Sequence, residues 1–376
     1  MTLKFATLGW NFARGIPMLS AKVNWLRKGR QLGRTPEVYM VPNARFLEFL
    51  QDIEPSPTTV SNSSKAHTGV RSHLKAQDDF KAKIEGDFLS GSYARNTSIR
   101  PKTDADGVVR PDVDIIIVTN YTEDDEPDDV LNDLCAALEG GGDGYVVERI
   151  NKRSIKLITS LAEMDVVPVI EWGEQYKIPD RESGEWKLTD PPGHISWSRD
   201  RNSDFGGRLK PLVKLFKWWR RENNSGKRPK GFVLEVLTAL HAPQNETHYG
   251  EAFAQMLENI HKAYAFQAEM DIKPIIYDPS VAGSDILAKV SITQWKAFIA
   301  KVKTYADYAR KAQSTDNMDD ATWYWRKVFG SRFPATETEK VAKASSLLEK
   351  AAATAGTSSY VFPDAMAAPT KPRGFA

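Results

Sequence analysis

The chain has 376 residues, 41% of them hydrophobic and 27% charged, which is ordinary for a globular protein long enough to form two domains. Its formal net charge of +2 is too small for wholesale binding to nucleic acid or membranes. The single cysteine, Cys135, excludes an intramolecular disulfide and lies in an apolar helical pattern, typical of a packed thiol in a reducing compartment. Because every apolar run is too short to cross a bilayer, we expect a cytoplasmic protein without a membrane partner and without strong nucleic-acid binding.

Residues 1–39 carry seven basic side chains and no acidic one before Glu37. Arg14 interrupts the apolar stretch, so a secretory signal fits poorly. We expect a basic N-terminal extension that takes no part in the fold, either a disordered arm or residues translated from an upstream start codon.

The segment that follows predicts two helices and a strand. Apolar residues with helical spacing indicate a short helix at residues 43–53 and a long amphipathic helix at residues 61–83. Residues 55–59, which are rich in Pro, Ser and Thr, should separate the two helices. Residues 87–90 then predict a short strand.

This strand leads into a turn at Gly91 and Ser92. Glycine lets the backbone come close to a phosphate, and the hydroxyl and N–H groups of Ser92 and Tyr93 can donate hydrogen bonds to it. A Gly-Ser pair alone carries little information. It gains weight here because a linker and a strand headed by two carboxylates follow it.

Asp112 and Asp114 stand two residues apart at the start of a β-branched apolar run, residues 115–118. Side chains alternate along a strand, so both carboxylates point to the same side of it. The run behind them predicts a strand buried on both faces. Two carboxylates on one face of a rigid strand suit hard divalent cations.

A third carboxylate, Asp165, lies within another β-rich run, LAEMDVVPVI. Three carboxylates on neighbouring strands can hold two Mg²⁺ ions, with Mn²⁺ as an alternative, in the arrangement used for phosphoryl transfer. Glu163 shares a face with Asp165 and is a second ligand or an orienting neighbour. The acidic cluster at residues 122–129 instead predicts a solvated helix start at Pro127.

The remainder of the first half predicts two further strands and an irregular stretch. Residues 145–150 and 154–159 should form strands joined at residues 151–152, and they lead into the strand that carries Asp165. Residues 171–207, rich in Gly, Pro, Trp and charge, should be irregular and lie on a surface or beside a cleft.

Residues 209–223 predict a helix with an apolar stripe and a basic stripe at i, i+4, i+7 and i+11, formed by Lys210, Lys214, Lys217 and Arg221. Like charges at this spacing disfavour a helix, and a nucleoside triphosphate would relieve the repulsion. The alternative is a solvated face. Further helices are expected from residue 231, across residues 248–310, at residues 320–329 and after Pro334, before a disordered tail.

The order of these motifs resembles the polymerase-beta-like nucleotidyltransferase superfamily. More narrowly, GSYARNTSIRP, DVDIIIV and MDVVPVI resemble the bacterial cGAS/DncV-like nucleotidyltransferases, the CD-NTases of CBASS anti-phage systems. Matches to YKIP, FVLE and WRKVFGSRFP extend the resemblance over roughly residues 40–334.

The resemblance implies an α/β (α+β) fold with a nucleotidyltransferase lobe, a mixed sheet and a C-terminal helical lobe. The division would be a catalytic domain with N-terminal helices at 40–205, a helical lobe at 206–334, and a helix with a flexible tail at 335–376. It implies that Lys214 and Lys217 bind the triphosphate and that Phe232 stacks on the donor base, whereas the residues alone leave Phe232 equally suited to a core.

The implied activity joins ribonucleoside triphosphates, ATP among them, into a cyclic di- or trinucleotide second messenger. The implied catalytic residues and metal ligands are Asp112, Asp114 and Asp165. By the same resemblance, a ubiquitin-transfer-like partner would join the C-terminal Ala376 to other molecules, against the alternative of a frayed end. Two other functions stay open: transfer of a nucleotide to an antibiotic, a tRNA end or a protein, and nucleotide binding without catalysis.

Overall fold

The computed structural model describes residues 39–338, except 104–106, 108–109, 142–143 and 224–228, together with residues 340–341 and 345–347. The expected basic extension up to residue 38, most of the helix after Pro334 and the expected conjugation site at Ala376 lie outside the described residues. Within the described part, no helix is both long and apolar enough to cross a membrane.

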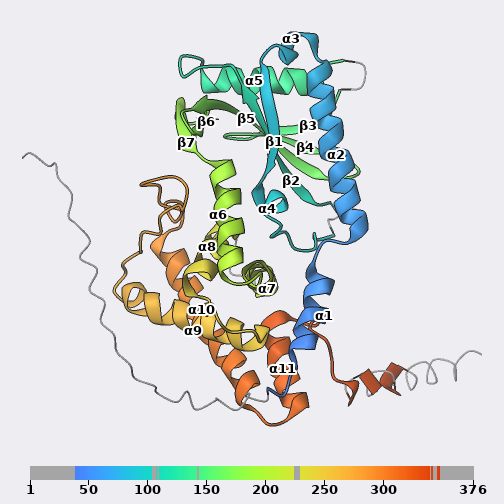
Figure 1. Cartoon of the computed structure of the whole chain (residues 1–376), viewed down its shortest axis with the longest axis vertical. Helices are drawn as coiled ribbons and strands as arrows, with labels where there is room; N and C mark the ends of the chain where they lie inside the picture. Colours follow the sequence, from blue (N-terminus) through green and yellow to red (C-terminus); the bar gives the residue numbers. More distant parts are fainter. Residues whose placement is uncertain are drawn as a thin grey trace, which may run out of the picture. The chain divides into compact units, whose positions relative to one another are not determined.

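The first half of the described chain is built on one mixed sheet (Figure 1). Its strands are β1 (Ile84–Ser90), β2 (Asp112–Thr119), β3 (Val147–Ile150), β4 (Ile155–Ile158), β5 (Glu163–Trp172), β6 (Gln175–Asp180) and β7 (Glu185–Thr189). The strand order is β1-β2-β5-β4-β3, and β6 and β7 extend from β5. Strands β2 and β5 are parallel, whereas β1 and β4 run antiparallel to them, which confirms the expected mixed sheet.

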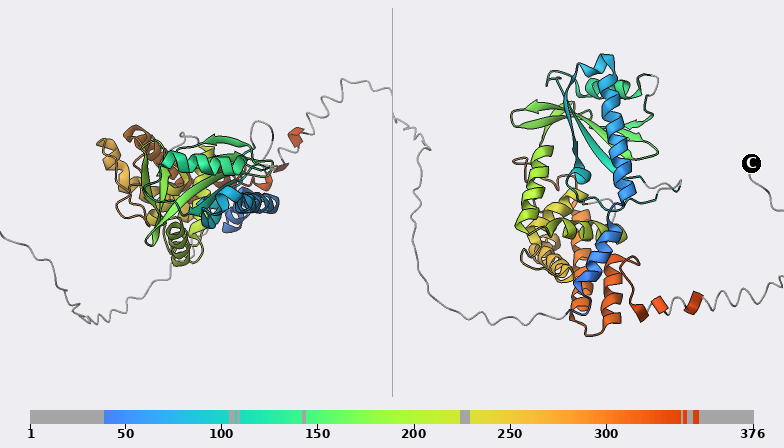
Figure 2. Two further views of the ribbon diagram at one scale, coloured as in Figure 1. Left: turned by 90° about the horizontal axis from the view of Figure 1, so that it is seen from above. Right: turned by 45° about the vertical axis from the view of Figure 1, so that its right-hand side comes forward.

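Two long helices, α2 (Pro57–Ala76) and α5 (Pro127–Glu139), cover one face of this sheet. Their apolar residues pack against alternate residues of β2, β4 and β5, and the right-hand view of Figure 2 shows α2 lying along the sheet. The opposite face carries a smaller apolar cluster around Ile116 and Val167. By strand alternation, Asp112, Asp114 and Asp165 lie on this second face, away from α2 and α5.

The helix expected at residues 61–83 is bounded differently. It begins at Pro57, because Ser56 caps it by accepting a hydrogen bond from the Thr59 N–H at 3.1 Å and Pro57 has no N–H to leave unpaired. It ends at Ala76, and a short helix, α3 (Asp78–Lys81), follows Gln77. Residues 54–56 therefore separate α1 from α2, as expected, whereas residues 57–59 already form the first turn of α2.

The prediction of an irregular stretch at 171–207 is wrong. Strands β6 and β7 form a hairpin there, with Gly173 and Gly184 at positive φ in the turns, and α6 (Pro191–Asp204) follows. Asp190 caps α6 by accepting the Gly193 N–H at 2.8 Å, and prolines occupy its first positions. The prediction failed because the polar composition of this stretch is also compatible with a hairpin and a capped helix.

A second core is formed by helices from both ends of the described chain. It contains α1 (Asn43–Ile53), α7 (Leu209–Glu222), α8 (Gly231–His241), α9 (Tyr249–Glu269), α10 (Ile292–Ser314) and α11 (Met318–Phe329). Phe46 and Phe49 of α1 pack edge-on against Trp325 and Trp218, so α1 belongs to this helical core although it precedes the sheet in sequence.

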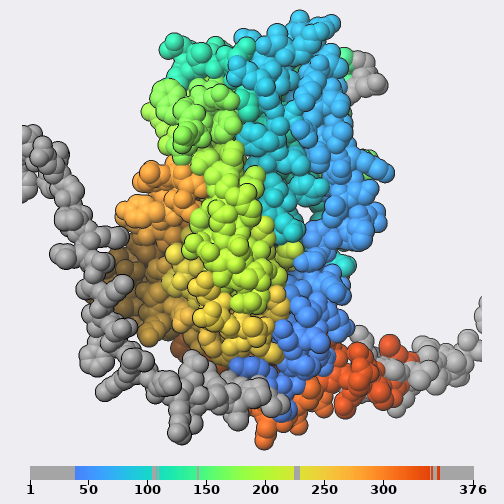
Figure 3. Space-filling model, viewed as in Figure 1, coloured from blue at the N-terminus to red at the C-terminus, as the bar shows by residue number. Residues whose placement is uncertain are grey.

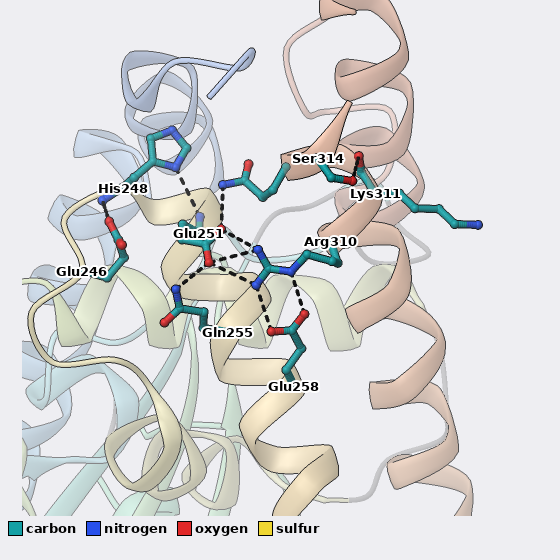
Figure 4. Close-up of polar contacts among 9 residues, drawn as sticks. Glu246, His248, Glu251, Gln255, Glu258, Arg310, Lys311 and Ser314 are labelled. Carbon is teal, nitrogen blue, oxygen red and sulfur yellow. Dashed lines mark hydrogen bonds and ion pairs between the residues drawn. The ribbon is translucent and has the colours of Figure 1, made fainter. Parts of the chain in front are cut away.

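Polar contacts fix α9 against α10 (Figure 4). Arg310 of α10 donates to Glu251 at 2.9 Å and to Glu258 at 2.7 Å, both on α9. His248 caps the start of α9 by accepting the Glu251 N–H at 3.2 Å. These contacts join α9 to α10 within the helical core.

Candidate active site

The register of β2 and β5 brings the acidic residues together. Asp114 lies beside Asp165 in the parallel ladder, and Asp112 lies beside Glu163. All four side chains belong to the first residues of their strands and to the same face of the sheet. The carboxylates selected from the sequence are thus neighbours at the N-terminal ends of β2 and β5.

Asp165 is oriented by two donors from the β3–β4 hairpin. The Ser154 hydroxyl donates to Oδ1 of Asp165 at 2.8 Å, and the Asn151 side-chain amide donates to the same oxygen at 3.1 Å. One carboxylate oxygen is therefore fixed, and the other, Oδ2, faces its neighbours across the sheet. Outer hydrogen bonds of this kind typically hold a metal-binding or catalytic carboxylate in place.

A lysine that sequence reasoning missed lies among the carboxylates. Nζ of Lys156, on β4, is 3.0 Å from Glu163, 3.4 Å from Asp112 and 3.5 Å from Asp165. Burial alone would lower the pKa of Lys156, but the surrounding carboxylates raise it, so the side chain is charged. The sequence carried one signal for this role, a lysine within the apolar run of β4 shortly before the strand that carries Asp165.

Asp114 is packed against Gly91. Gly91 has φ +67°, and a Cβ added there would lie 1.6 Å from Oδ2 of Asp114, so only glycine fits both the backbone and the contact. Burial, together with Asp112 and Asp165, raises the pKa of Asp114 to about 7, against the opposing effect of Arg95 and Lys156. The carboxyl group of Asp114 therefore keeps its proton to a higher pH than a solvated aspartate does.

The donor chemistry of the site fits a hard divalent cation, because carboxylate oxygens are its preferred ligands. As they stand in the described residues, however, no three acidic, imidazole or thiol groups converge closely enough to enclose an ion. Lys156 supplies the positive charge that balances Asp112, Glu163 and Asp165 in this arrangement.

A cavity of about 1160 Å³ opens beside the carboxylates, between the sheet and the helices α7 and α8. Its walls include most of the residues singled out from the sequence: Gly91, Ser92, Tyr93, Asp112, Asp114, Lys217 and Phe232. Asp165 and Lys214 are not among its lining residues. In Figure 3 the surface is open between the blue residues of α1 and α2 and the cyan residues that precede β2.

The Gly-Ser turn forms the short helix α4 (Gly91–Ala94), whose residues face this cavity. The Ser92 hydroxyl lies 3.0 Å from the Ser98 hydroxyl, and the Thr97 N–H donates to the Ser92 carbonyl at 2.9 Å. Local hydrogen bonds thus hold the turn in shape while its Ser92 and Tyr93 side chains stay at the cavity wall.

Two lysines of the expected basic stripe, Lys214 and Lys217, are neither solvated nor free cations. Lys214 is buried and pairs with Glu54 at 2.7 Å. Lys217 is buried and donates to Glu235 at 2.7 Å and to the Thr97 carbonyl at 3.1 Å. Lys217 reaches the cavity wall, whereas Lys214 is turned toward α1.

Glu235 of α8 is the centre of this buried network, and sequence reasoning assigned it no role. It accepts two hydrogen bonds from Arg95, at 3.0 and 3.1 Å, one from Thr97 at 3.0 Å and one from Lys217. Burial would raise the pKa of Glu235, but Lys217 and Arg95 lower it to about 2. The network joins the chain after α4 to α7 and α8 beneath the cavity.

Phe232 is at the cavity wall, as a base-stacking residue would be, but it is also packed. The Arg95 guanidinium lies 5.0 Å from its ring centre, and the rings of His194 and Trp197 lie at 4.7 and 6.1 Å.

The mixed sheet presents paired carboxylates beside a glycine turn, and a cavity separates these carboxylates from helices α7 and α8. This arrangement is that of a nucleotidyltransferase of the polymerase-beta-like fold. The family model described as "Second Messenger Oligonucleotide or Dinucleotide Synthetase domain" matches residues 40–202. The structure of Bradyrhizobium diazoefficiens CdnG in complex with GTP has a TM-score of 0.64 at 16% identity, covering 77% of this chain and 95% of that one.

Two characterised relatives span nearly the same length. The cyclic AMP-AMP-AMP synthase of Acinetobacter sp. (strain ATCC 27244 / 9458) is 42% identical over 342 residues, which cover 90% of this chain and 99% of that protein. The cyclic AMP-AMP-GMP synthase of Enterobacter hormaechei subsp. hoffmannii (strain UCI 50) is 27% identical, covering 77% of this chain and 91% of that one. The chain belongs to the cGAS/DncV-like nucleotidyltransferases. It is an enzyme that makes a cyclic nucleotide second messenger.

Proposed function

We propose that this enzyme joins three adenylates from ATP into a cyclic trinucleotide. The observation that carries the proposal is the 42% identity to a cyclic AMP-AMP-AMP synthase across 99% of that protein's length. We also propose that the enzyme acts in the cytoplasm, where its product would switch on an anti-phage effector.

In each transfer, a ribose hydroxyl of one nucleotide attacks the α-phosphorus of another. A new P–O bond forms, the bond to the bridging oxygen breaks, and pyrophosphate leaves. We assign Asp165 to orient the attacking hydroxyl and take its proton, because Ser154 and Asn151 hold one oxygen of this carboxylate and leave the other directed into the acidic cluster. Ser92 and Lys217 face the cavity where the triphosphate would lie.

Asp112, Asp114 and Asp165 would hold two Mg²⁺ ions, with Mn²⁺ as an alternative. When bound, the ions would offset the negative charge that develops on the phosphate oxygens. Lys156 already balances part of the acidic charge in their absence. Phe232, partly held by Arg95 and His194, would present a ring edge or face to the donor base.

The product tests the proposal. The purified enzyme is incubated with Mg²⁺ and all four ribonucleoside triphosphates, treated with phosphatase, and the resistant product is weighed by mass spectrometry. A mass of three adenylates without terminal phosphate is expected. A resistant product of another size or base composition would overturn the choice of product while leaving the enzyme class intact.

A further inference from the structure

A second cavity, of about 580 Å³, adjoins the active-site cavity. The two share Arg100, Pro101, Lys102 and Arg221 in their walls. The other described lining residues come from the N-terminal end of α2 with its cap Ser56, and are joined by Thr103, Trp218, Glu222 and Arg332. The two cavities are therefore neighbours on either side of these four residues.

The walls of this second cavity are strongly basic. Four cationic side chains line it, Arg100, Lys102, Arg221 and Arg332, against one carboxylate, Glu222. Asp52 of α1 pairs with Arg332 at 2.9 Å and with Arg100 at 3.3 Å. Among the described residues, the four cations exceed these two carboxylates by two charges.

Arg221 shows how closely these cations are held. Its guanidinium lies 4.0 Å from the ring centre of Trp218 and donates to the backbone carbonyl of Arg100. Burial, together with Arg332 and Arg100, lowers the pKa of Arg221 to about 10. Nε of Arg100 is buried and has no hydrogen-bond partner in the described part of the chain. An anion bound among such cations would reduce the repulsion between them.

The start of α2 adds a second source of positive potential. Ser56, Thr58, Thr59 and Asn62, at its N-terminal end, line the same cavity. The N-terminus of a 20-residue helix favours an anion, and arginine matches phosphate oxygens with paired N–H groups. The helix end and the arginine cluster face the same space, so both favour the same kind of ligand.

We propose that the second cavity is a polyphosphate-binding site, which takes either the pyrophosphate released at the active site or the triphosphate of a nucleotide. The pyrophosphate source rests on the proposed function, whereas the basic walls do not depend on it. Its position beyond the shared wall would draw pyrophosphate away from the reacting centre.

Arg332 gives the sharpest test, because it lines the second cavity and not the active-site cavity. Sodium pyrophosphate and ATP are titrated separately into the full chain by calorimetry, in the presence of a chelator so that no turnover occurs. The Arg332→Gln variant should bind the occupant about ten- to a hundredfold more weakly, as expected for loss of a charge-assisted contact. If Arg332→Gln weakens the binding of pyrophosphate alone, the second cavity binds the reaction product. If it weakens the binding of ATP alone, the second cavity binds a nucleotide.

Two further variants separate binding from folding. Arg181 does not line this cavity, and its guanidinium pairs with Asp128 at 2.7 Å. The Arg181→Gln variant should therefore bind both probes as the wild type does. Glu222→Gln removes the only carboxylate among the described lining residues and should strengthen binding severalfold. Equal affinity of the wild type, Arg332→Gln and Glu222→Gln for both probes would overturn the proposal. Because no metal or turnover is involved, that result is distinct from a failure to make the cyclic product.

Discussion

The environment of Asp114 differs strongly from that of a solvated carboxylate. The folded protein holds a proton on Asp114 up to about pH 7, whereas the unfolded chain releases it near pH 4. The raised pKa therefore costs stability once the group ionises, and the metal-free protein should lose stability as pH rises from about 4 to 7. A bound cation would remove this cost.

We expect Asp114→Asn to raise the melting temperature of the chelator-treated protein at pH 8 and to abolish nucleotidyl transfer. The gain should be about 2–4 °C for each kcal/mol of relieved repulsion and desolvation. At pH 4 the variant and the wild type should melt together. Thermal unfolding across this pH range checks the prediction, and a variant that is less stable than the wild type at pH 8 would contradict it.

Lys156 carries the second prediction at this scale. Lys156→Met keeps the length of the side chain but removes the charge that balances Asp112, Glu163 and Asp165, so the chelator-treated variant should melt at a lower temperature. Added Mg²⁺ should then raise its melting temperature more than that of the wild type. Lys187→Met, which removes a partly exposed lysine on β7 outside the site, is the matched control. A smaller Mg²⁺ effect in Lys156→Met than in the wild type would show that the lysine does not act as a counter-charge.

The sequence predicted the carboxylates and the glycine turn because period-two spacing and a glycine are local signals. Asp165 and Gly91 could be selected without knowing which strands pair. The role of Lys156 depends on β4 lying beside β5, and the role of Glu235 depends on α8 facing the chain after α4. Such long-range contacts leave no spacing pattern in the sequence, so these two residues were missed.

At the scale of elements, α7 and α8 are joined to the catalytic half through Glu235. Glu235→Gln would leave Arg95 and Lys217 buried without a full counter-charge, and breaking a buried pair typically costs about 3–5 kcal/mol. We expect a lower melting temperature at pH 7. The lowered pKa of Glu235 stabilises the fold above about pH 4.5, and this contribution is lost as pH falls toward about 2.

The pH dependence distinguishes this network from simple packing. Between about pH 4.5 and 2 the wild type should lose stability more steeply than Glu235→Gln, since the variant has no carboxylate to protonate. Glu174→Gln, an exposed change in the β5–β6 turn, serves as the control. Parallel pH profiles for the wild type and Glu235→Gln would rule out the network as a stabilising ion pair.

Elements with strong apolar periodicity were predicted well, and those defined by caps and turns were not. Helix α1 and the strand that begins at Asp112 follow their sequence patterns closely. The β6–β7 hairpin and α6 depend on Gly173, Gly184 and Asp190, which are single-residue signals within a polar stretch. The polar composition of residues 171–207 therefore led to the prediction of an irregular stretch.

At the scale of the whole molecule, we propose the division expected from the sequence, with the catalytic domain at residues 40–205 and the helical lobe at 206–334. Helix α1 is the exception in packing, because it joins the core of the helical lobe while α2 packs on the sheet. The chain therefore links the two cores through residues 54–56, through the buried Glu235 network and through the connection from α6 to α7.

The central claim is that the carboxylates beside Gly91 carry out nucleotidyl transfer. Pyrophosphate release from ATP in the presence of Mg²⁺ tests it most directly, measured for the wild type, for the Asp112→Asn, Asp114→Asn double variant, and for Asp129→Asn, an exposed change on α5. The double variant should fold and release pyrophosphate only at background level, while Asp129→Asn should match the wild type. Release at the wild-type rate by a folded double variant would contradict the claim.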